Sequence, residues 1–475
     1  MSVLLNESIS LTPLFRGEVE NSSQPDRSRD LGSSSSSAGN ALSPGSLDPP
    51  NYISDTEDER VSSLYRTLLL LAGFMMIFQT IGINQTYGIF QEFYTSQESN
   101  ILDAAGNDAL VSLVGTIGSG LTWSGCILVS PLLSLNRPKI ISLVGAILMS
   151  LGIVLASFAS KLWHLFLTQS FLYGIGSSLL YYPILAFTPP FFDRRRGAAM
   201  GFVLSGSGAG GLVMAPALRF LLAHVGIRWT LRILGLWNLV VCVPVACAAR
   251  TPPGYRNATR ISLNLAKQGT FLFQSLGAFL QAAGNVIPLY YLTTYSTSVL
   301  AYSSATASLL LALNSAVNSV SRIGMGFLAD SVGRQNTMVF SVILSGASVL
   351  ALWLDANRTR FIVFTIAYGV YAGGYNALLP TTLAEVYGVQ NYAAVNAAVY
   401  FIRGLGAFFG APVAGVILGT HERKTNVSPS ASWLLRMRYD HVVLFDGALL
   451  LGAGACMAYV RWLDAKKKGR WMWKA

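Results

Sequence analysis

The sequence predicts an all-α membrane protein with twelve transmembrane helices in two parallel six-helix halves. Of its 475 residues, 52% are hydrophobic and only 12% are charged, whereas about a quarter are charged in ordinary soluble domains. The apolar residues gather in runs of about 20, which is the length needed to cross a bilayer. Such runs must be helical, because lipid offers no partner for an unpaired backbone group. The second half of the chain also repeats features of the first.

Twelve apolar stretches are long enough to cross a membrane. The predicted spans lie at residues 66–88, 110–132, 139–159, 163–189, 197–222, 229–249, 269–296, 304–325, 337–355, 360–383, 390–418 and 441–463. The longest loop on the predicted inner side, 250–268, separates six spans from six. It therefore divides an N-terminal six-helix half, 64–249, from a C-terminal six-helix half, 269–463.

The two ends of the chain differ from the spans in composition. Residues 1–63 contain a serine run, Ser33–Ser37, and too few apolar residues to pack a core, which predicts a disordered tail. Residues 464–475 form a basic tail. Lys and Arg concentrate in the inner loops and this tail, so the positive-inside rule predicts that both termini and the central loop are cytoplasmic. The plasma membrane is the favoured location, and a vacuolar or other organelle membrane is the alternative.

An internal repeat supports the division into halves. Shifting the fifth span by 196 residues places Gly208 on Gly404 and Gly210 on Gly406. The matches fall in corresponding spans of the two halves, which favours duplication over chance. Two parallel six-helix repeats are the plan of a transporter whose halves rock about a central site.

A polar motif lies between the eighth and ninth predicted spans. Its sequence, Gly326-Phe-Leu-Ala-Asp330-Ser-Val-Gly333-Arg334, resembles the GxxxDRxGR signature of the major facilitator superfamily. In that family the loop acts as a conformational latch on the inner face, so the resemblance implies this role for Gly326, Asp330, Gly333 and Arg334. Ser331 stands where the family usually has arginine, and the corresponding loop of the first half has lost the pattern. An ordinary polar turn is the alternative.

A second resemblance covers nearly the whole membrane region. The stretches Pro189-Pro-Phe-Phe-Asp-Arg-Arg-Arg-Gly and Tyr87-Gly-Ile-Phe-Gln-Glu-Phe-Tyr resemble the monocarboxylate porter-like family, especially its fungal branch. The resemblance implies a secondary active or facilitative transporter of a small organic acid, working by alternating access, with protons as a candidate coupling ion. The first span lacks the lysine that some members use to bind a carboxylate. Export of a larger or neutral secondary metabolite is therefore the alternative.

Charged residues inside spans mark candidate sites, because a charge is costly to bury in a membrane. Arg322 follows Asn318 by one helical turn in the eighth span. The porter family carries an Asp/Arg pair at this spacing and its arginine contacts the substrate anion, so the resemblance implies substrate binding by Arg322 and Asn318. The alternatives are that Arg322 snorkels to the inner end or pairs with Asp330. Arg403 in the eleventh span is a second candidate, and Asp446 in the twelfth is a candidate proton carrier, ion-pair partner or outer-end cap.

Polar and aromatic residues also interrupt the first, fourth, seventh and tenth spans. These four spans line the central cavity in the superfamily, which implies that the interrupting residues contact the substrate. The alternative for the tyrosines is anchoring at the membrane interface. The candidates are Asn84, Tyr182, Tyr290, Tyr371, Tyr375 and Asn376.

Other sequence features argue against different kinds of protein. The net charge of +11 does not indicate nucleic-acid binding, because the basic residues lie in short clusters between apolar spans. The four histidines lack the spacing of a metal site and no nucleophile–base set is visible, so we expect no enzyme activity, no cofactor and no metal. A non-transporting membrane sensor is a further alternative, although the long folded cytoplasmic tail typical of one is absent.

Two Asn-X-Ser/Thr sequons, at Asn357 and Asn426, fall in predicted outer loops. Glycosylation is not favoured at either, because the first lies in a short loop and the second precedes a proline. The expected partners are a small-molecule substrate and the lipid bilayer. The sequence does not set an oligomeric state.

Overall fold

The structure, a computed structural model, describes most of the predicted membrane region. The predicted tail up to residue 62, residues 252–262 of the central loop and Asn426 lie outside the described residues. The described residues are 63–96, 101, 103–104, 107–135, 137–188, 191–192, 196–251, 263–419 and 429–469. They belong to one structural unit, Arg60–Ala475.

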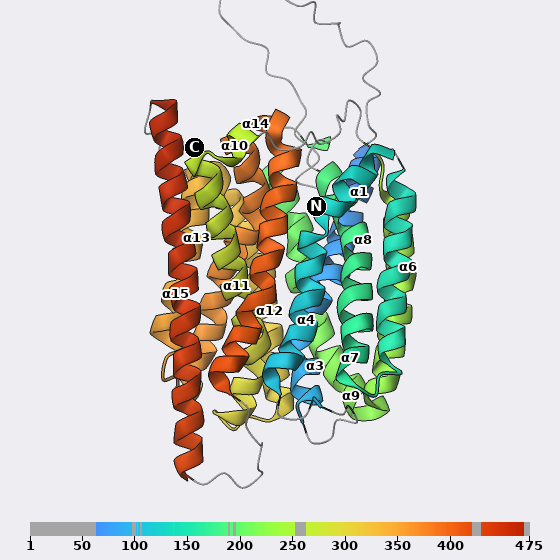
Figure 1. Ribbon diagram of the computed structural model, residues 1–475, viewed down its shortest axis with the longest axis vertical. Helices are drawn as coiled ribbons and strands as arrows, with labels where there is room; N and C mark the ends of the chain where they lie inside the picture. The colour runs from blue at the N-terminus through green and yellow to red at the C-terminus, as the bar shows by residue number, and fades with distance from the viewer. Residues whose placement is uncertain are drawn as a thin grey trace, which may run out of the picture. The chain divides into compact units, whose positions relative to one another are not determined.

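The first half of the chain consists of helical segments, several of which follow one another directly (Figure 1). Its first rod is made of α1 (Ser63–Ile77), the π-helix η2 (Phe78–Gly82), α2 (Ile83–Gln85) and α3 (Tyr87–Tyr94). The later segments are α4 (Asp108–Ser124), α5 (Cys126–Leu132), η3 (Leu133–Leu135), α6 (Pro138–Ala156), α7 (Leu162–Leu165), the π-helix η4 (Phe166–Leu172), α8 (Tyr173–Phe187) and α9 (Arg196–Ala248). Gly226 breaks α9, because its φ of 71° is a conformation that glycine adopts more readily than other residues.

The second half has the same character. Its segments are α10 (Leu263–Ala266), α11 (Gly269–Ser298), α12 (Ser304–Val332), α13 (Arg334–Ser348), the π-helix η6 (Val349–Trp353), α14 (Arg358–Leu418) and α15 (Pro429–Lys468). A break at Gly388 divides α14 into two rods. Helix α10 lies inside the predicted central loop, and α15 continues into the predicted basic tail, where Lys468 pairs with Asp464 at 2.8 Å.

Nine helices among the described residues are long and apolar enough to cross a membrane. One of them, Ala199–Ala248, contains the break at Gly226. Helices α11 and α12 fall outside this count although they run through the bundle, since polar residues such as Gln281, Asn285 and Asn318 lower their hydropathy. The all-α membrane fold is thus confirmed, and the count of twelve spans stays a prediction.

The outer surface of the bundle is apolar. Leu128, Val240, Val320 and Val416 each expose about 70% of their surface, at 72%, 69%, 73% and 71%. Large exposed side chains of this kind are unfavourable in water and favourable against lipid. The buried polar residues instead lie between helices, where neighbouring chain segments replace lipid.

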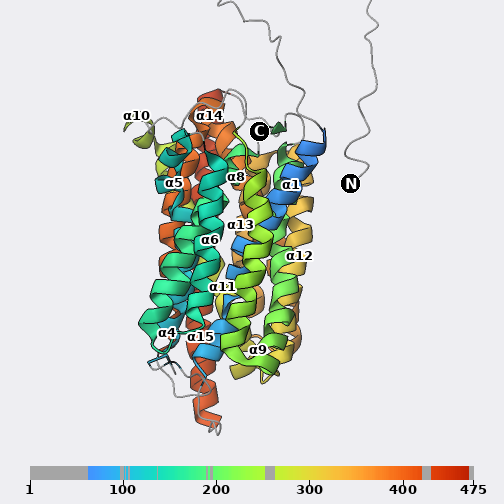
Figure 2. The ribbon, with the colours of Figure 1, turned by 90° about the vertical axis from the view of Figure 1, so that its right-hand side faces the viewer.

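Glycines of the predicted repeat occupy equivalent packing positions. A Cβ on Gly208 of α9 would lie 2.4 Å from the Ser315 carbonyl oxygen of α12, and one on Gly404 of α14 would lie 2.5 Å from the Gly120 carbonyl oxygen of α4. Both are contacts between the two halves, and Figure 2 shows α12 beside α9. Only glycine allows the backbones to approach this closely. The two halves are therefore joined through related surfaces.

Candidate substrate-binding site

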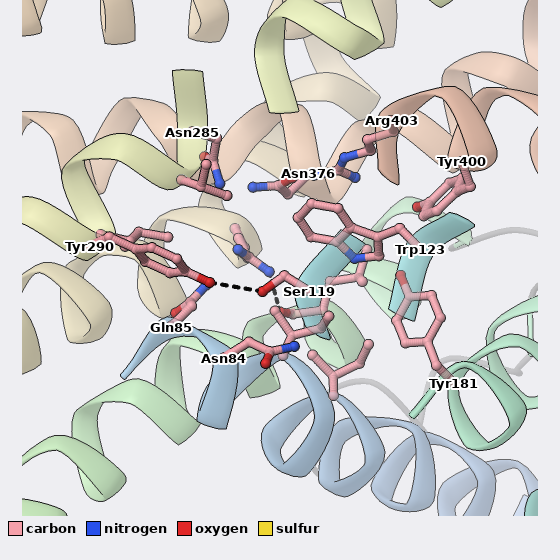
Figure 3. Close-up of a pocket in the computed structure, with 16 residues that line it drawn as sticks. Asn84, Gln85, Ser119, Trp123, Tyr181, Asn285, Tyr290, Asn376, Tyr400 and Arg403 are labelled. Atoms are coloured by element: carbon pink, nitrogen blue, oxygen red, sulfur yellow. Dashed lines mark hydrogen bonds between the residues drawn. The ribbon is translucent and has the colours of Figure 1, made fainter. Parts of the chain in front are cut away.

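A pocket lies between the two halves of the bundle (Figure 3). Helices α1, η2, α2, α4, α8 and α9 contribute to it from the first half, and α11, α12 and α14 from the second. Its lining combines aromatic rings, amides and two arginines. The lining residues are Ile77, Ile81, Asn84, Gln85, Ser119, Trp123, Tyr181, Leu204, Asn285, Val286, Leu289, Tyr290, Arg322, Asn376, Tyr400 and Arg403.

Arg322 of α12 is buried at the pocket, with 3% of its surface exposed. Its Nε donates to Asn318 Oδ1 at 2.8 Å, and its Nη1 donates to the Leu204 carbonyl oxygen of α9 at 2.7 Å. The second bond crosses between the halves. Because Arg322 is buried, it does not snorkel in this conformation. Its hydrogen-bond partners among the described residues are Asn318 and Leu204, and Asp330 pairs with Arg334 at 3.5 Å instead.

Arg403 of α14 is the second buried cation of the pocket, also with 3% of its surface exposed. Its guanidinium carbon lies 4.4 Å from the ring centre of Trp123, which belongs to the first half. The corresponding distances to Tyr375 and Tyr400 are 5.5 and 5.6 Å. Its Nη2 donates to Asn376 Oδ1, while its buried Nε has no hydrogen-bond partner among the described residues. Figure 3 shows Arg403, Asn376 and Trp123 grouped together.

The first rod of the chain supplies the opposite wall. Its π-helix η2 carries Ile81 and is followed directly by α2, which carries Asn84 and Gln85. The Thr80 carbonyl oxygen within η2 accepts a hydrogen bond of 2.9 Å from the hydroxyl of Tyr173 in α8. Single π-helical turns in α-helices occur frequently at functional sites, and this one lies directly beside the pocket.

Most of the predicted site residues meet in this pocket. Asn84, Tyr290, Arg322, Asn376 and Arg403 line it. Asn318 and Tyr375 support it through their contacts with the two arginines. Tyr290 also reaches across the halves, with its hydroxyl 3.0 Å from Ser119 Oγ.

Besides Asn318 and Tyr375, two more predicted residues lie outside the pocket lining. Tyr182 is buried, and Tyr371 is half-buried with its carbonyl oxygen accepting a hydrogen bond from Ser341. Tyr181, which directly precedes Tyr182, does line the pocket. The two tyrosines differ because adjacent residues of an α-helix point about 100° apart. The prediction also omitted Ser119, Trp123, Asn285 and Tyr400. Of these, only Asn285 had a visible signal, as a polar residue in an apolar stretch.

A second polar cluster joins the halves at the end of the bundle that holds α3 and the start of α12. Glu92 of α3 forms an ion pair with Arg219 of α9. Ser304 Oγ of α12 donates to Glu92 Oε1 at 2.8 Å, and Arg219 Nε donates to Ser308 Oγ at 3.0 Å. We call these four residues the outer clamp, after the side of the membrane on which the sequence predicts this end of the bundle to lie. Because Glu92 and Arg219 belong to the first half and both serines to the second, the cluster ties the two halves together at this end.

The predicted latch lies toward the opposite end. Gly326 is buried, and Gly333 ends α12 with a φ of 109°. Asp330 and Arg334 are half-exposed and form an ion pair across the turn at Gly333. The next residue, Gln335, donates from its Nε2 to Glu385 Oε1 at 3.0 Å and to Asp464 Oδ2 at 2.8 Å. These contacts all lie within the second half.

Asp446 is fully buried inside α15 and does not cap its end. Neither of its carboxylate oxygens has a hydrogen-bond partner among the described residues. Helix α11 packs against it at Gly284, where a Cβ would lie 3.0 Å from Asp446 Oδ1. At the surface, Asn357 caps α14 by accepting a hydrogen bond of 2.9 Å from the Arg360 amide.

Comparison with known proteins assigns the family. The sequence profile of the Major Facilitator Superfamily matches residues 67–324 and 274–470. The MFS-type transporter pynF of Aspergillus niger is 27% identical over 408 residues, which cover 84% of this chain and 89% of that protein. The agnestins efflux protein AgnL12 of Paecilomyces divaricatus is 28% identical over 358 residues, covering 74% of this chain and 81% of that protein. The aspyridones efflux protein apdF of Emericella nidulans is 25% identical over 386 residues, covering 80% of this chain and 75% of that protein.

Solved structures share the fold. A bacterial homolog of the human lysosomal transporter Spinster, in an inward-facing and occupied conformation, matches with a TM-score of 0.64 at 17% sequence identity. The match covers 86% of this chain and 99% of that one. Because the family profile covers most of the chain, the chain belongs to the Major Facilitator Superfamily, and it is a multi-pass membrane transporter and not an enzyme.

Proposed function

We propose that the chain exports an organic anion with a flat ring, of the kind produced in secondary metabolism, by alternating access. The observation that carries this proposal is the charge of the pocket. Two buried guanidinium groups, of Arg322 and Arg403, line it together. No acidic side chain is found among the described residues that line it.

An anionic substrate would balance this charge. Burying a guanidinium in a membrane protein is costly unless it is paired. Arg322 is held by an amide oxygen and a carbonyl oxygen, which are neutral acceptors. Its planar fork of donors matches the two oxygens of a carboxylate. The rings of Trp123, Tyr181 and Tyr400 line the same space and offer flat apolar surfaces for an unsaturated ring.

The relatives support export as the direction. Two of them are named as efflux proteins, for agnestins and for aspyridones. The resemblance to the monocarboxylate porter-like family supports an acidic group on the substrate. Together they favour an acidic metabolite larger than a simple monocarboxylate. The chain would move it from the cytoplasmic face of the plasma membrane, where both termini are expected to lie, to the outside.

The outer clamp supports alternating access. Its four side chains close one end of the bundle, and the pocket lies between the halves. Substrate would enter from the end that carries the latch residues, and opening of the clamp would release it on the other side. Asp446 is our candidate for binding a coupling proton, because an unpaired carboxylate is costly to bury in its charged form.

A pair of matched ligands tests the proposal. Binding of naphthoate and of the neutral naphthamide to the purified full chain in detergent is measured by titration calorimetry. We expect naphthoate to bind about tenfold more tightly or better, since a charge-assisted pair with arginine is about twice as strong as a neutral hydrogen bond. Arg322→Gln should remove most of this preference.

Transport in proteoliposomes completes the test. Vesicles that contain the wild-type chain should accumulate labelled naphthoate, and vesicles that contain Arg322→Gln should not. Equal binding of the acid and the amide would overturn the anion assignment. It would favour the neutral metabolite, with which the missing lysine in the first span agrees.

A further inference from the structure

We propose that the pocket has two anion subsites, one at Arg322 and one at Arg403, and that it selects substrates with two acidic groups. This inference rests on the proposed function and specifies its substrate class. The resemblance to the porter family concerns the arginine of the eighth span alone. The second subsite follows from the surroundings of Arg403.

The first step is the charge balance of the pocket. The two guanidinium groups line the same pocket, and like charges repel. The polar groups around them are amides and hydroxyls, which are neutral. A substrate with one negative charge would leave one buried cation without a counter-charge, whereas a substrate with two would balance both.

The second step is the construction of the Arg403 environment. Trp123, Tyr375 and Tyr400 lie around the guanidinium, within cation–π distance. They hold the group in place but carry no negative charge. Asn376 Oδ1 accepts from Nη2 only, and the buried Nε has no partner among the described residues. An oriented and buried donor without an acceptor is what an anion subsite presents before its ligand binds.

The third step is the position of the two subsites on different helices. Arg322 comes from α12 and is tied to Leu204 of α9. Arg403 comes from α14 and lies against Trp123 of α4. A dianion that contacts both arginines would therefore contact both seams between the halves, α9 with α12 and α4 with α14. Acidic groups at two separated positions of a flat ring fit this arrangement.

Small aromatic acids that differ only in charge and spacing test the inference. Phthalate, isophthalate and terephthalate are dianions of one ring with three spacings, and terephthalamate is a monoanion of the same size as terephthalate. Binding of each to the purified full chain is measured by titration calorimetry near neutral pH. We expect at least one dianion to bind about tenfold more tightly than terephthalamate.

Variants at Arg403 assign the second subsite. Arg403→Gln should reduce dianion binding to the level of terephthalamate, so that the about tenfold ratio of the two affinities falls to about one. Arg403→Lys keeps the charge and should keep part of the dianion preference. The melting midpoint in detergent shows whether each variant is folded, and the comparison of ligands on the wild-type chain needs no variant.

The outcomes separate this inference from the proposed function. If the dianions and terephthalamate bind equally, and naphthoate still binds better than naphthamide, the second subsite is wrong and the anion transporter stands. The same conclusion follows if Arg403→Gln weakens monoanions and dianions by one common factor. If no anion binds better than its neutral amide, the proposed function fails and this inference fails with it.

Discussion

Ser304 in the second half of the chain donates a hydrogen bond of 2.8 Å to the carboxylate of Glu92 in the first half. The same carboxylate pairs with Arg219, which in turn donates to Ser308. The helices that carry these residues belong to different halves, so the bonds can form only while this end of the bundle is closed. The outer clamp thus couples a local electrostatic contact to the conformation of the whole transporter.

Removing the charge of Glu92 should open the outer end more often. We expect Glu92→Gln to weaken the clamp by about 1 kcal/mol and to raise the open population about fivefold. Ser119→Cys serves as a reporter at the pocket, in a Cys247→Ser background because Cys247 is the exposed cysteine among the described residues. The measurement is the rate at which an impermeant maleimide, added on the outer side, labels the reporter.

A matched control exists for this experiment. Asp355 pairs with Arg436 at 2.8 Å, but both residues belong to the second half. Asp355 has a φ of 48°, which asparagine also tolerates, so Asp355→Asn removes an ion pair without straining the backbone. Labelling should stay at the wild-type rate in this variant. A labelling rate for Glu92→Gln no higher than that of Asp355→Asn would show that the clamp does not control the outer end.

Asn318→Asp should weaken anion binding while leaving the fold intact. The introduced carboxylate would occupy the position that already accepts from Arg322 Nε at 2.8 Å. An internal counter-ion lowers the attraction of Arg322 for a substrate anion, and we expect naphthoate affinity to fall about tenfold. Titration calorimetry measures the affinity, and the melting midpoint reports on the fold.

The companion variant Asn318→Ala separates charge from positioning. It removes the hydrogen bond to Arg322 but adds no negative charge, so naphthoate affinity should fall by less than about threefold. If the alanine and aspartate variants lose affinity equally, Asn318 acts by orienting Arg322. If neither loses affinity, Arg322 has no role in binding the anion.

The fold and part of the site could be predicted from the sequence because both leave a local signal. Uninterrupted apolar runs predict helices in lipid, and the pairs Gly208 with Gly404 and Gly210 with Gly406 predict related packing. All four glycines do sit at close helix contacts. Arg322 and Arg403 stood out because arginines are rare inside apolar spans, and the structure brings both to one pocket.

The remaining site residues depend on contacts between distant parts of the chain. Glu92 and Arg219 lie 127 positions apart, and neither carries a local signal that it meets the other. In the sequence, Trp123 cannot be distinguished from an aromatic residue that faces lipid. Its place in the pocket follows from the packing of α4 against α14. Tyr181 and Tyr182 are both tyrosines of one span, and only the rotation of α8 decides that Tyr181 lines the pocket. Helix rotation and the pairing of the halves are tertiary properties.

If Asp446 binds the coupling proton as proposed, Asp446→Asn should preserve the fold and abolish transport driven by a pH gradient. The carboxyl is fully buried without a hydrogen-bond partner among the described residues, so a neutral amide of the same shape should be tolerated. We expect the melting midpoint to stay within about 2 °C of wild type. Accumulation of naphthoate driven by a pH gradient should be lost, because an amide cannot bind and release a proton.

Asp440→Asn is the control for this variant. Asp440 lies on the same helix, and its Oδ1 accepts a hydrogen bond of 3.0 Å from the Asp355 amide, which asparagine can also accept. Transport by Asp440→Asn that is driven by a pH gradient should match that of the wild type. If Asp446→Asn accumulates naphthoate normally under a pH gradient, Asp446 has no role in coupling, whatever the result for Asp440→Asn.

Gly333 of the latch and Gly324, which lies before it, should respond oppositely to alanine. Gly333 has a φ of 109°, a conformation unfavourable for any residue with a Cβ, so Gly333→Ala should destabilise the protein by about 1–3 kcal/mol. Gly324 lies within helix α12, and a Cβ there would meet nothing within 4 Å, so Gly324→Ala should be neutral or stabilising by up to about 1 kcal/mol. Melting midpoints of the two variants in detergent measure the difference. If Gly333→Ala melts no lower than Gly324→Ala, the turn after α12 does not depend on glycine, and the latch motif loses its structural basis at this position.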